Sequence, residues 1–193
     1  QSYVTQREAA EMQQSLRAGM HMLTDELRSA GYNPTGDVAV GFVMQFASPY
    51  NLFVIDYVTD DTILAFTLDD DGDRTIDANE QIAYRYHSST KALERFEALA
   101  PIDKWQPLIA NVDAVNFVYV DGNGAVTSDP AEFRFVEVTL LIRADRPTHD
   151  YTNKTAYHNR HGKDLCPTCL GDHYHRRLLT TTVQIRNAGL GSL

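Results

Sequence analysis

Apolar residues recur at steps of three and four along residues 4–30, a spacing that predicts one long amphipathic helix. The apolar stripe of this helix consists of Met12, Leu16, Met20, Leu23 and Leu27. We expect the helix to end at Gly31, because glycine readily adopts the left-handed conformation that caps helices, and Pro34 prevents continuation. The remaining faces are polar and charged, so the stripe is expected to pack on a core.

After the helix, the pattern changes to the alternation and β-branched runs that are typical of strands. Six strands are predicted, at residues 62–68, 81–87, 90–97, 114–120, 133–144 and 178–186. An Asp-Gly-Asn-Gly sequence at 121–124 predicts a plain hairpin turn. Residues 145–176 are polar and rich in His, Asn and Tyr, and are predicted to form a long surface loop.

The order of these elements predicts the α+β class, with no repeat and no linker dividing the chain. We therefore expect a single domain over residues 1–193, in which the helix (1–31) packs on a mainly antiparallel β-sheet formed by residues 32–193.

Composition limits the possible functions. The 193 residues are 43% hydrophobic and include ten Tyr and eight Phe, which is enough apolar material for a core and argues against disorder. The 26 Asp and Glu outnumber the 17 Lys and Arg, giving a net charge of −9. This acidic balance argues against binding to nucleic acid or to an anionic membrane surface. No run approaches the roughly 18 apolar residues that a membrane span requires.

The strongest chemical signal is the acidic segment at residues 69–80 (DDDGDRTIDANE), which matches a twelve-residue calcium loop. The predicted oxygen ligands are the side chains of Asp69, Asp71, Asp73, Asp77 and Glu80, together with the backbone carbonyl of Thr75. Calcium takes six to eight oxygens in a flexible geometry, and closely spaced carboxylates on a turned backbone provide them. A plain acidic turn around Asp71 and Gly72 is the alternative.

Arg74 departs from the calcium-loop pattern, because it occupies the sixth position, where glycine normally allows a sharp turn. A side chain at positive φ costs about 1 kcal/mol, and the guanidinium also opposes a bound cation. We therefore expect either a weakened site or a different path of the backbone.

A second cluster lies in residues 158–175, where a Cys-Pro-Thr-Cys sequence is surrounded by histidines. Cys166 and Cys169 have the spacing of zinc ligands, and the candidate partners are His158, His161, His173 and His175. A short-range disulfide between the two cysteines is the favoured interpretation, ahead of structural zinc, and the histidines are alternatively ordinary surface residues. A redox-active pair is a third alternative, although the sequence lacks the strand-then-helix context of such motifs.

No catalytic residue is predicted. The chain contains no nucleophile elbow, no zinc-protease helix motif and no phosphate- or dinucleotide-binding glycine loop. Its acidic residues are concentrated in the segment that calcium binding explains.

Several segments together resemble a known family. Residues 11–20 (EMQQSLRAGM) and 23–36 (LTDELRSAGYNPTG) are similar to the stretch that follows the membrane helix in W-type minor pilins of type IV pili and in J-type pseudopilins of type II secretion. The acidic loop continuing into residues 80–86 (EQIAYRY) and the closing residues 176–187 (RRLLTTTVQIRN) resemble this family's middle and final strands.

The resemblance implies a non-catalytic, pilin-like subunit in the bacterial envelope, at the periplasm or cell surface, which helps initiate or cap filament assembly. It also implies a hydrophobic N-terminal helix before Gln1 that anchors the protein in the inner membrane, and partners among other minor pilins, pseudopilins and the major pilin. The His/Cys segment does not belong to the family pattern. An alternative function is therefore a freestanding extracellular, metal-dependent binding module that uses residues 145–176, and a metal-dependent enzyme using the same cluster is a further alternative.

Overall fold

The computed structural model describes residues 2–36, 38–42, 59–97 and 104–187. Its single long helix, α1 (Ser2–Arg28), agrees with the predicted amphipathic helix. Gly31 follows the last turn with a φ of 73°, as predicted, and its backbone N–H donates to the Thr67 carbonyl at 3.0 Å. Among the described residues, no helix combines the length and the apolar character that crossing a membrane requires.

The strands form two antiparallel sheets, where the sequence predicted one sheet. The first sheet has the order β1 (Ile63–Thr67), β2 (Gln81–His87), β3 (Ala92–Glu97) and β4 (Lys104–Ile109). The second has the order β5 (Val112–Val120), β6 (Phe135–Arg143) and β7 (Arg176–Gln184). Strand β4 was not predicted, because Pro107 and its neighbours show no clear alternation.

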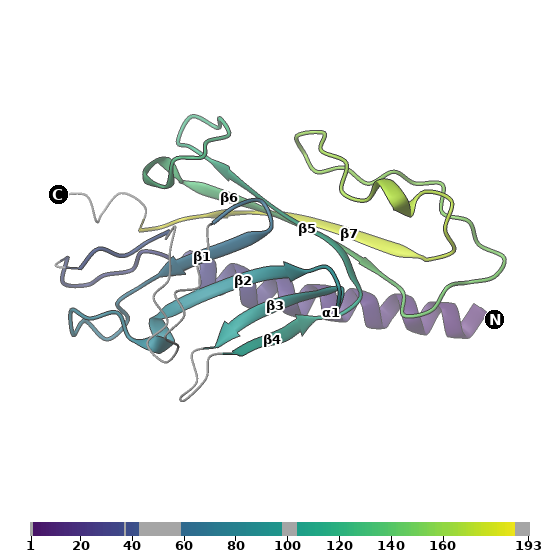
Figure 1. Cartoon of the computed structure of the whole chain (residues 1–193), viewed down its shortest axis with the longest axis horizontal. Helices are drawn as coiled ribbons and strands as arrows, with labels where there is room; N and C mark the ends of the chain where they lie inside the picture. The colour runs from purple at the N-terminus through teal and green to yellow at the C-terminus, as the bar shows by residue number, and fades with distance from the viewer. Residues whose placement is uncertain (1, 37, 43–58, 98–103, 188–193) are drawn as a thin grey trace.

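Helix α1 covers both sheets and joins them into one core (Figure 1). The predicted stripe is correct: Leu16, Met20, Leu23 and Leu27 are buried, and Met12 packs partly against the same core. The helix approaches β4 closely at Gly19, where an added Cβ would lie 2.3 Å from Ile109. The missing side chain of Gly19 therefore sets how near the helix can lie to the first sheet.

A polar contact also fixes the helix to the first sheet. The Tyr84 hydroxyl donates to Glu26 Oε2 at 2.5 Å, and Arg95 forms an ion pair with the same carboxylate at 3.0 Å. Burial, followed by the Glu26 charge, raises the pKa of Tyr84 well above its ordinary value, so the hydroxyl stays protonated in the folded protein.

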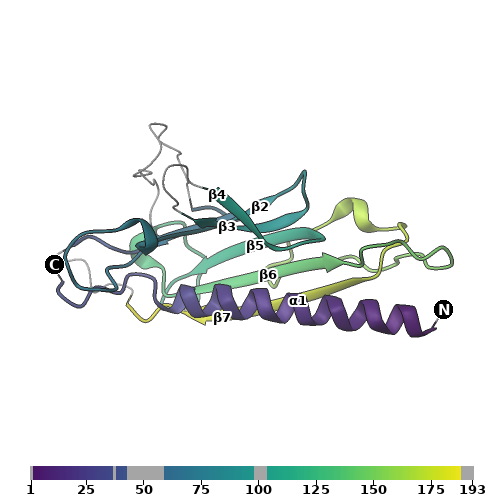
Figure 2. The same ribbon diagram turned by 90° about the horizontal axis from the view of Figure 1, so that it is seen from below.

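The predicted loop lies between β6 and β7, and we call residues 144–175 the lobe. As predicted, it contains no named strand; it has one short 3-10 helix (Pro167–Cys169) and one isolated β-bridge. It is packed more tightly than a loose surface loop, because Tyr157 and Cys169 are buried against Ala114 and Leu141. Since successive residues of β6 face opposite sides, the lobe covers the face of the second sheet that points away from α1 (Figure 2).

Candidate functional site

The acidic loop (residues 69–80) connects β1 to β2 and brings three of the predicted calcium ligands together. Carboxylate oxygens of Asp69, Asp71 and Asp73 all lie within 4.8 Å of one another. Asp69 is fully buried, whereas the other two side chains are exposed to solvent. Three negative charges at this distance repel one another, and a divalent cation would relieve that repulsion.

Hydrogen bonds within the loop fold the backbone around these carboxylates. Asp69 Oδ1 accepts from the backbone N–H of Gly72 at 2.8 Å, and Asp71 Oδ1 accepts from that of Asp73 at 3.1 Å. Asp73 Oδ1 accepts from both the hydroxyl and the N–H of Thr75, at 2.7 and 2.8 Å. The Thr75 hydroxyl, followed by its N–H, lowers the pKa of Asp73, so this carboxylate remains ionised in mildly acidic solution.

One buried carboxylate oxygen of the acidic loop has no hydrogen-bond partner. Asp69 Oδ2 is buried and accepts no hydrogen bond, although Asp69 Oδ1 is paired. A buried carboxylate oxygen without a hydrogen bond is costly, and a bound cation would satisfy it. Within the described residues, moreover, none of the three clustered carboxylates forms an ion pair with a basic side chain.

Arg74 adopts the turn that the calcium-loop pattern requires. Its φ is 73°, so the chain takes the left-handed conformation that glycine usually supplies at this position. The backbone therefore does not depart from the expected turn at Arg74, and a weakened affinity for calcium stays a prediction.

The remaining predicted ligands lie outside the three-carboxylate group. Both oxygens of the buried Glu80 side chain accept backbone N–H groups, from Asp70 at 2.6 Å and from Asp77 at 2.8 Å, which closes the loop on itself. Asp77 precedes the short 3-10 helix Ala78–Glu80 and is exposed. Coordination by Asp77, Glu80 and the Thr75 carbonyl stays a prediction.

In the lobe, Cys166 and Cys169 are joined in a disulfide, with their Cα atoms 5.4 Å apart. The four candidate histidines lie elsewhere. His161 Nε2 lies 3.1 Å from Glu137 and His175 stacks on Tyr151, while His173 contacts the Tyr151 carbonyl and His158 forms a β-bridge with Asp164. In the described part of the chain, the metal-ligating groups that cluster with the two cysteines include Asp113 and none of these histidines.

Asp113 is a residue that sequence reasoning missed. Its side chain is only 3% exposed and pairs with Arg176 Nε at 2.7 Å and with Lys91 Nζ at 3.2 Å. Arg176 also forms a forked ion pair with Asp172. An acid within the apolar strand at residues 112–120 was the available signal, since such a buried charge requires partners.

These contacts shift the titration of the paired groups. Burial alone lowers the pKa of Arg176, but the bonds to Asp172 and Asp113 outweigh it and raise the pKa above its ordinary value. The hydrogen bonds from Arg176 hold the pKa of Asp172 below its ordinary value. The lobe therefore balances its buried charges with protein side chains, and no ion is needed to do so.

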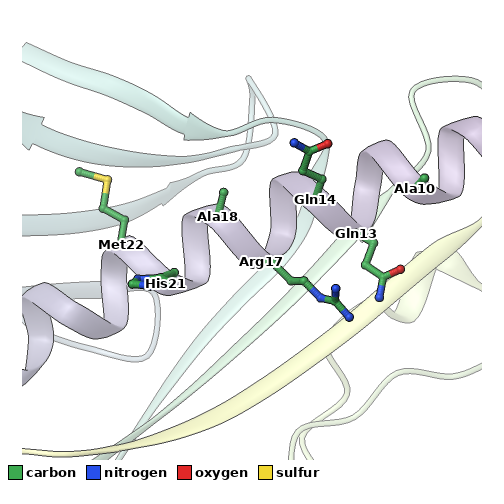
Figure 3. Close-up of a pocket in the computed structure, with 7 residues that line it drawn as sticks. All are labelled: Ala10, Gln13, Gln14, Arg17, Ala18, His21 and Met22. Atoms are coloured by element: carbon green, nitrogen blue, oxygen red, sulfur yellow. The ribbon is translucent and has the colours of Figure 1, made fainter.

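The outward face of α1 forms a third feature. A shallow hollow follows this face, as Figure 3 shows. Its lining residues are Ala10, Gln13, Gln14, Arg17, Ala18, His21 and Met22. Met22, 38% exposed, is one of the exposed large hydrophobic residues of the protein. Along one line of this face the uncharged residues Ala10, Gln14, Ala18 and Met22 recur at spacings of four, and they offer a contact surface along the helix.

Comparison with known proteins gives the following matches. The profile of the family described as prepilin peptidase-dependent protein B matches residues 5–158. Among solved structures, the chain is similar to a type IV-like pilin from Thermus thermophilus, at 14% identity and a TM-score of 0.48. That alignment covers 92% of this chain and 98% of the other. No curated protein matches the sequence.

Proposed function

The chain belongs to the prepilin peptidase-dependent protein B family, and from this membership we propose that it is a non-catalytic structural subunit of a pilus-type filament. The observation that carries the proposal is the family match, which starts within α1 and extends through the first sheet and strands β5 and β6 into the lobe. We propose that the subunit acts as a minor pilin or pseudopilin that helps initiate or cap a type IV pilus or a type II secretion pseudopilus.

The arrangement of α1 supports this role. One stripe of the helix packs on the two sheets, and the opposite face carries the hollow between Ala10 and Met22. A helix with a buried stripe and an exposed opposite face that includes Ala10, Ala18 and Met22 can pack against helices of neighbouring subunits. We propose that other minor pilins or pseudopilins and the major pilin occupy this face.

The proposal includes a place in the cell envelope. A hydrophobic helix that precedes Gln1 and continues α1 would anchor the subunit in the inner membrane before assembly, with the sheets and the lobe on the periplasmic side. The gene sequence upstream of Gln1 tests this point, because roughly 20 apolar residues after a short basic leader are required. A polar start, or an ordinary cleavable signal, would contradict it.

We also propose that calcium stabilises the acidic loop. The support comes from the clustered carboxylates of Asp69, Asp71 and Asp73, the unpartnered Asp69 Oδ2 and the left-handed turn at Arg74. Calorimetric titration of the chelator-treated protein with Ca²⁺ should show one site per chain. The variant Asp69→Asn should abolish the site, whereas Asp121→Asn, in the exposed turn after β5, should not.

The subunit role is tested in the source organism with the full-length gene. We expect deletion to reduce surface filaments or secretion, and the wild-type gene to restore them. Met22→Asp should fail to restore assembly while leaving the urea unfolding of the purified protein unchanged. Val126→Asp provides the matched control, because Val126 is also an exposed hydrophobic residue but lies in the turn region after β5. Normal filaments and normal secretion in the deletion strain would contradict the proposal.

A further inference from the structure

We propose that the Cys166–Cys169 disulfide is a reversible redox centre that exchanges with a protein dithiol, and that Cys166 is the sulfur under attack. This inference does not depend on the proposed filament role. It rests on three observations: the unequal exposure of the two cysteines, a buried carboxylate within hydrogen-bond reach of Cys169, and contacts that hold both residues in place without the disulfide.

The two cysteines differ in access. Cys169 is 2% exposed, whereas Cys166 is partly exposed and is followed by the exposed residues Pro167 and Thr168. Thiol–disulfide exchange requires a thiolate to reach one sulfur of the disulfide directly. A protein dithiol can therefore approach Cys166 and not Cys169, which makes Cys169 the leaving group.

Asp113 supplies a hydrogen-bond acceptor that is useful only after reduction. Its Oδ2 atom lies 3.8 Å from Cys169 Sγ, within reach of a sulfur hydrogen bond. In the disulfide this sulfur carries no proton, so the contact gains nothing. Once the disulfide is reduced, the Cys169 thiol can donate a hydrogen bond to the Asp113 carboxylate. Asp113 thus favours the dithiol over the disulfide and raises the reduction potential of the pair.

Three basic side chains surround Asp113 and hold its carboxylate in place. Arg176, itself 1% exposed at the side chain, donates to Asp113 Oδ2, while Lys91 and Arg143 lie 3.2 and 3.9 Å from Oδ1. The positive charge of these three residues also offsets the negative charge that appears when Cys169 leaves as a thiolate.

The exchange is balanced as follows. A thiolate of the partner attacks Cys166 Sγ, a new disulfide forms between these two sulfurs, and the old bond breaks with its electron pair on Cys169. Cys169 takes a proton released by the partner's thiols. The resulting Cys169 thiol then donates a hydrogen bond to Asp113. The partner's second thiolate then attacks the partner's first sulfur in the mixed disulfide, and Cys166 leaves with the electron pair and takes the second proton released by the partner's thiols. The partner is oxidised by two electrons and the cysteine pair is reduced.

The lobe retains contacts that position both cysteines when the disulfide is open. The Cys169 N–H donates to the Cys166 carbonyl at 3.0 Å, and the Cys166 N–H donates to Asp164 at 3.0 Å. The buried Asn153 side chain donates to the Cys169 carbonyl at 2.8 Å. Reduction is therefore expected to leave the lobe folded, as a reversible centre requires.

The primary test equilibrates the purified chain with dithiothreitol of graded oxidation state and measures free thiols by alkylation and mass spectrometry. We expect reversible gain of two thiols in the folded protein, with an unchanged urea unfolding transition of the remaining structure. Resistance to excess dithiothreitol until denaturant is added, or unfolding of the lobe on reduction, would overturn the proposal.

Variants test the two assigned roles. Asp113→Asn should shift the equilibrium about fivefold toward the disulfide, or about 20 mV for a two-electron couple. Asp172→Asn is the matched control, because it removes a partner of Arg176 without touching a sulfur, and should shift the equilibrium less than twofold. Equal shifts in both variants would remove Asp113 from the mechanism.

Single-cysteine variants keep the proposal testable even if Asp113→Asn does not fold. Cys166 in the Cys169→Ser variant should react with an aromatic disulfide reagent at least tenfold faster than Cys169 in the Cys166→Ser variant. Equal or reversed rates would contradict the assignment of Cys166 as the attacked sulfur.

Discussion

The acidic loop and the lobe both lack regular strands and both suggested metal binding from sequence, yet they handle charge in opposite ways. In the acidic loop, the carboxylates of Asp69, Asp71 and Asp73 face one another, and they accept hydrogen bonds from groups two or three residues away. Beneath the lobe, the buried charge of Asp113 in β5 is neutralised by Arg176 in β7, 63 residues later in the chain.

This difference indicates which kind of segment needs a bound cation to balance its carboxylates. A loop whose contacts are local cannot recruit distant cations, so its carboxylates remain close together and favour a bound divalent ion. A segment packed on a sheet gains partners from other strands and becomes internally neutral. The predictions below test this contrast, beginning with the largest expected effect.

Removing Arg176, the cation that pairs with Asp113 in β5 and with Asp172 in the lobe, should be the most damaging change. Arg176→Met leaves Asp113 and Asp172 without their shared partner, and breaking a buried ion pair in this way costs about 3–5 kcal/mol. The free energy of unfolding in urea measures the loss. Arg177→Met, at the exposed neighbouring residue, should change it by less than about 0.5 kcal/mol. Similar losses in the free energy of unfolding for Arg176→Met and Arg177→Met would contradict the view that Arg176 neutralises the buried charge of Asp113.

Calcium should stabilise the protein through the acidic loop. At a Ca²⁺ concentration 100 times the dissociation constant, the free energy of unfolding should rise by about 2.7 kcal/mol. Asp69→Asn should eliminate this gain. Asp121→Asn should retain it, although Asp121 also accepts two backbone N–H groups in an acidic turn. No gain in the wild-type protein would mean that the loop is only an acidic turn.

The Asp172–Arg176 pair should produce a pH dependence confined to acid. Because the folded-state pKa of Asp172 is lowered, its contribution is fully present above the unfolded pKa near 4 and is lost as the pH falls through the folded-state value. At pH 6, Asp172→Asn should lower the free energy of unfolding by about 1.5 kcal/mol. The difference from wild type should shrink at pH 3; a constant difference would argue against the ion pair.

Two substitutions at Arg74 should separate charge from backbone strain. Arg74→Gln removes a positive charge from the loop and should tighten calcium binding about fivefold. Arg74→Gly should tighten binding equally, and it should also raise the free energy of unfolding by about 1 kcal/mol relative to Arg74→Gln, because glycine adopts a φ of 73° without strain. Identical stabilities for the two variants would show that this turn is not strained.

Local patterns were sufficient to predict the long helix, six of the seven strands that the structure describes, and the spacing of the acidic loop. Each of these depends on residues a few positions apart, such as the stripe from Met12 to Leu27, so the sequence contains the whole signal. Strand β4 was missed because its sequence, KWQPLI, has no alternation, and it forms by pairing with β3.

The division into two sheets, the packing of the lobe and the Asp113 network depended on tertiary structure. These features depend on contacts between residues far apart in sequence, such as Asn159 with Asn116 and Asp113 with Cys169. Local sequence patterns do not predict such contacts. The sequence by itself determined where the long helix and six of the described strands form and where carboxylates gather in the acidic loop, because these are properties of neighbouring residues. The tertiary structure alone decided that a buried acid lies beside the disulfide, because only packing brings Asp113 to Cys169.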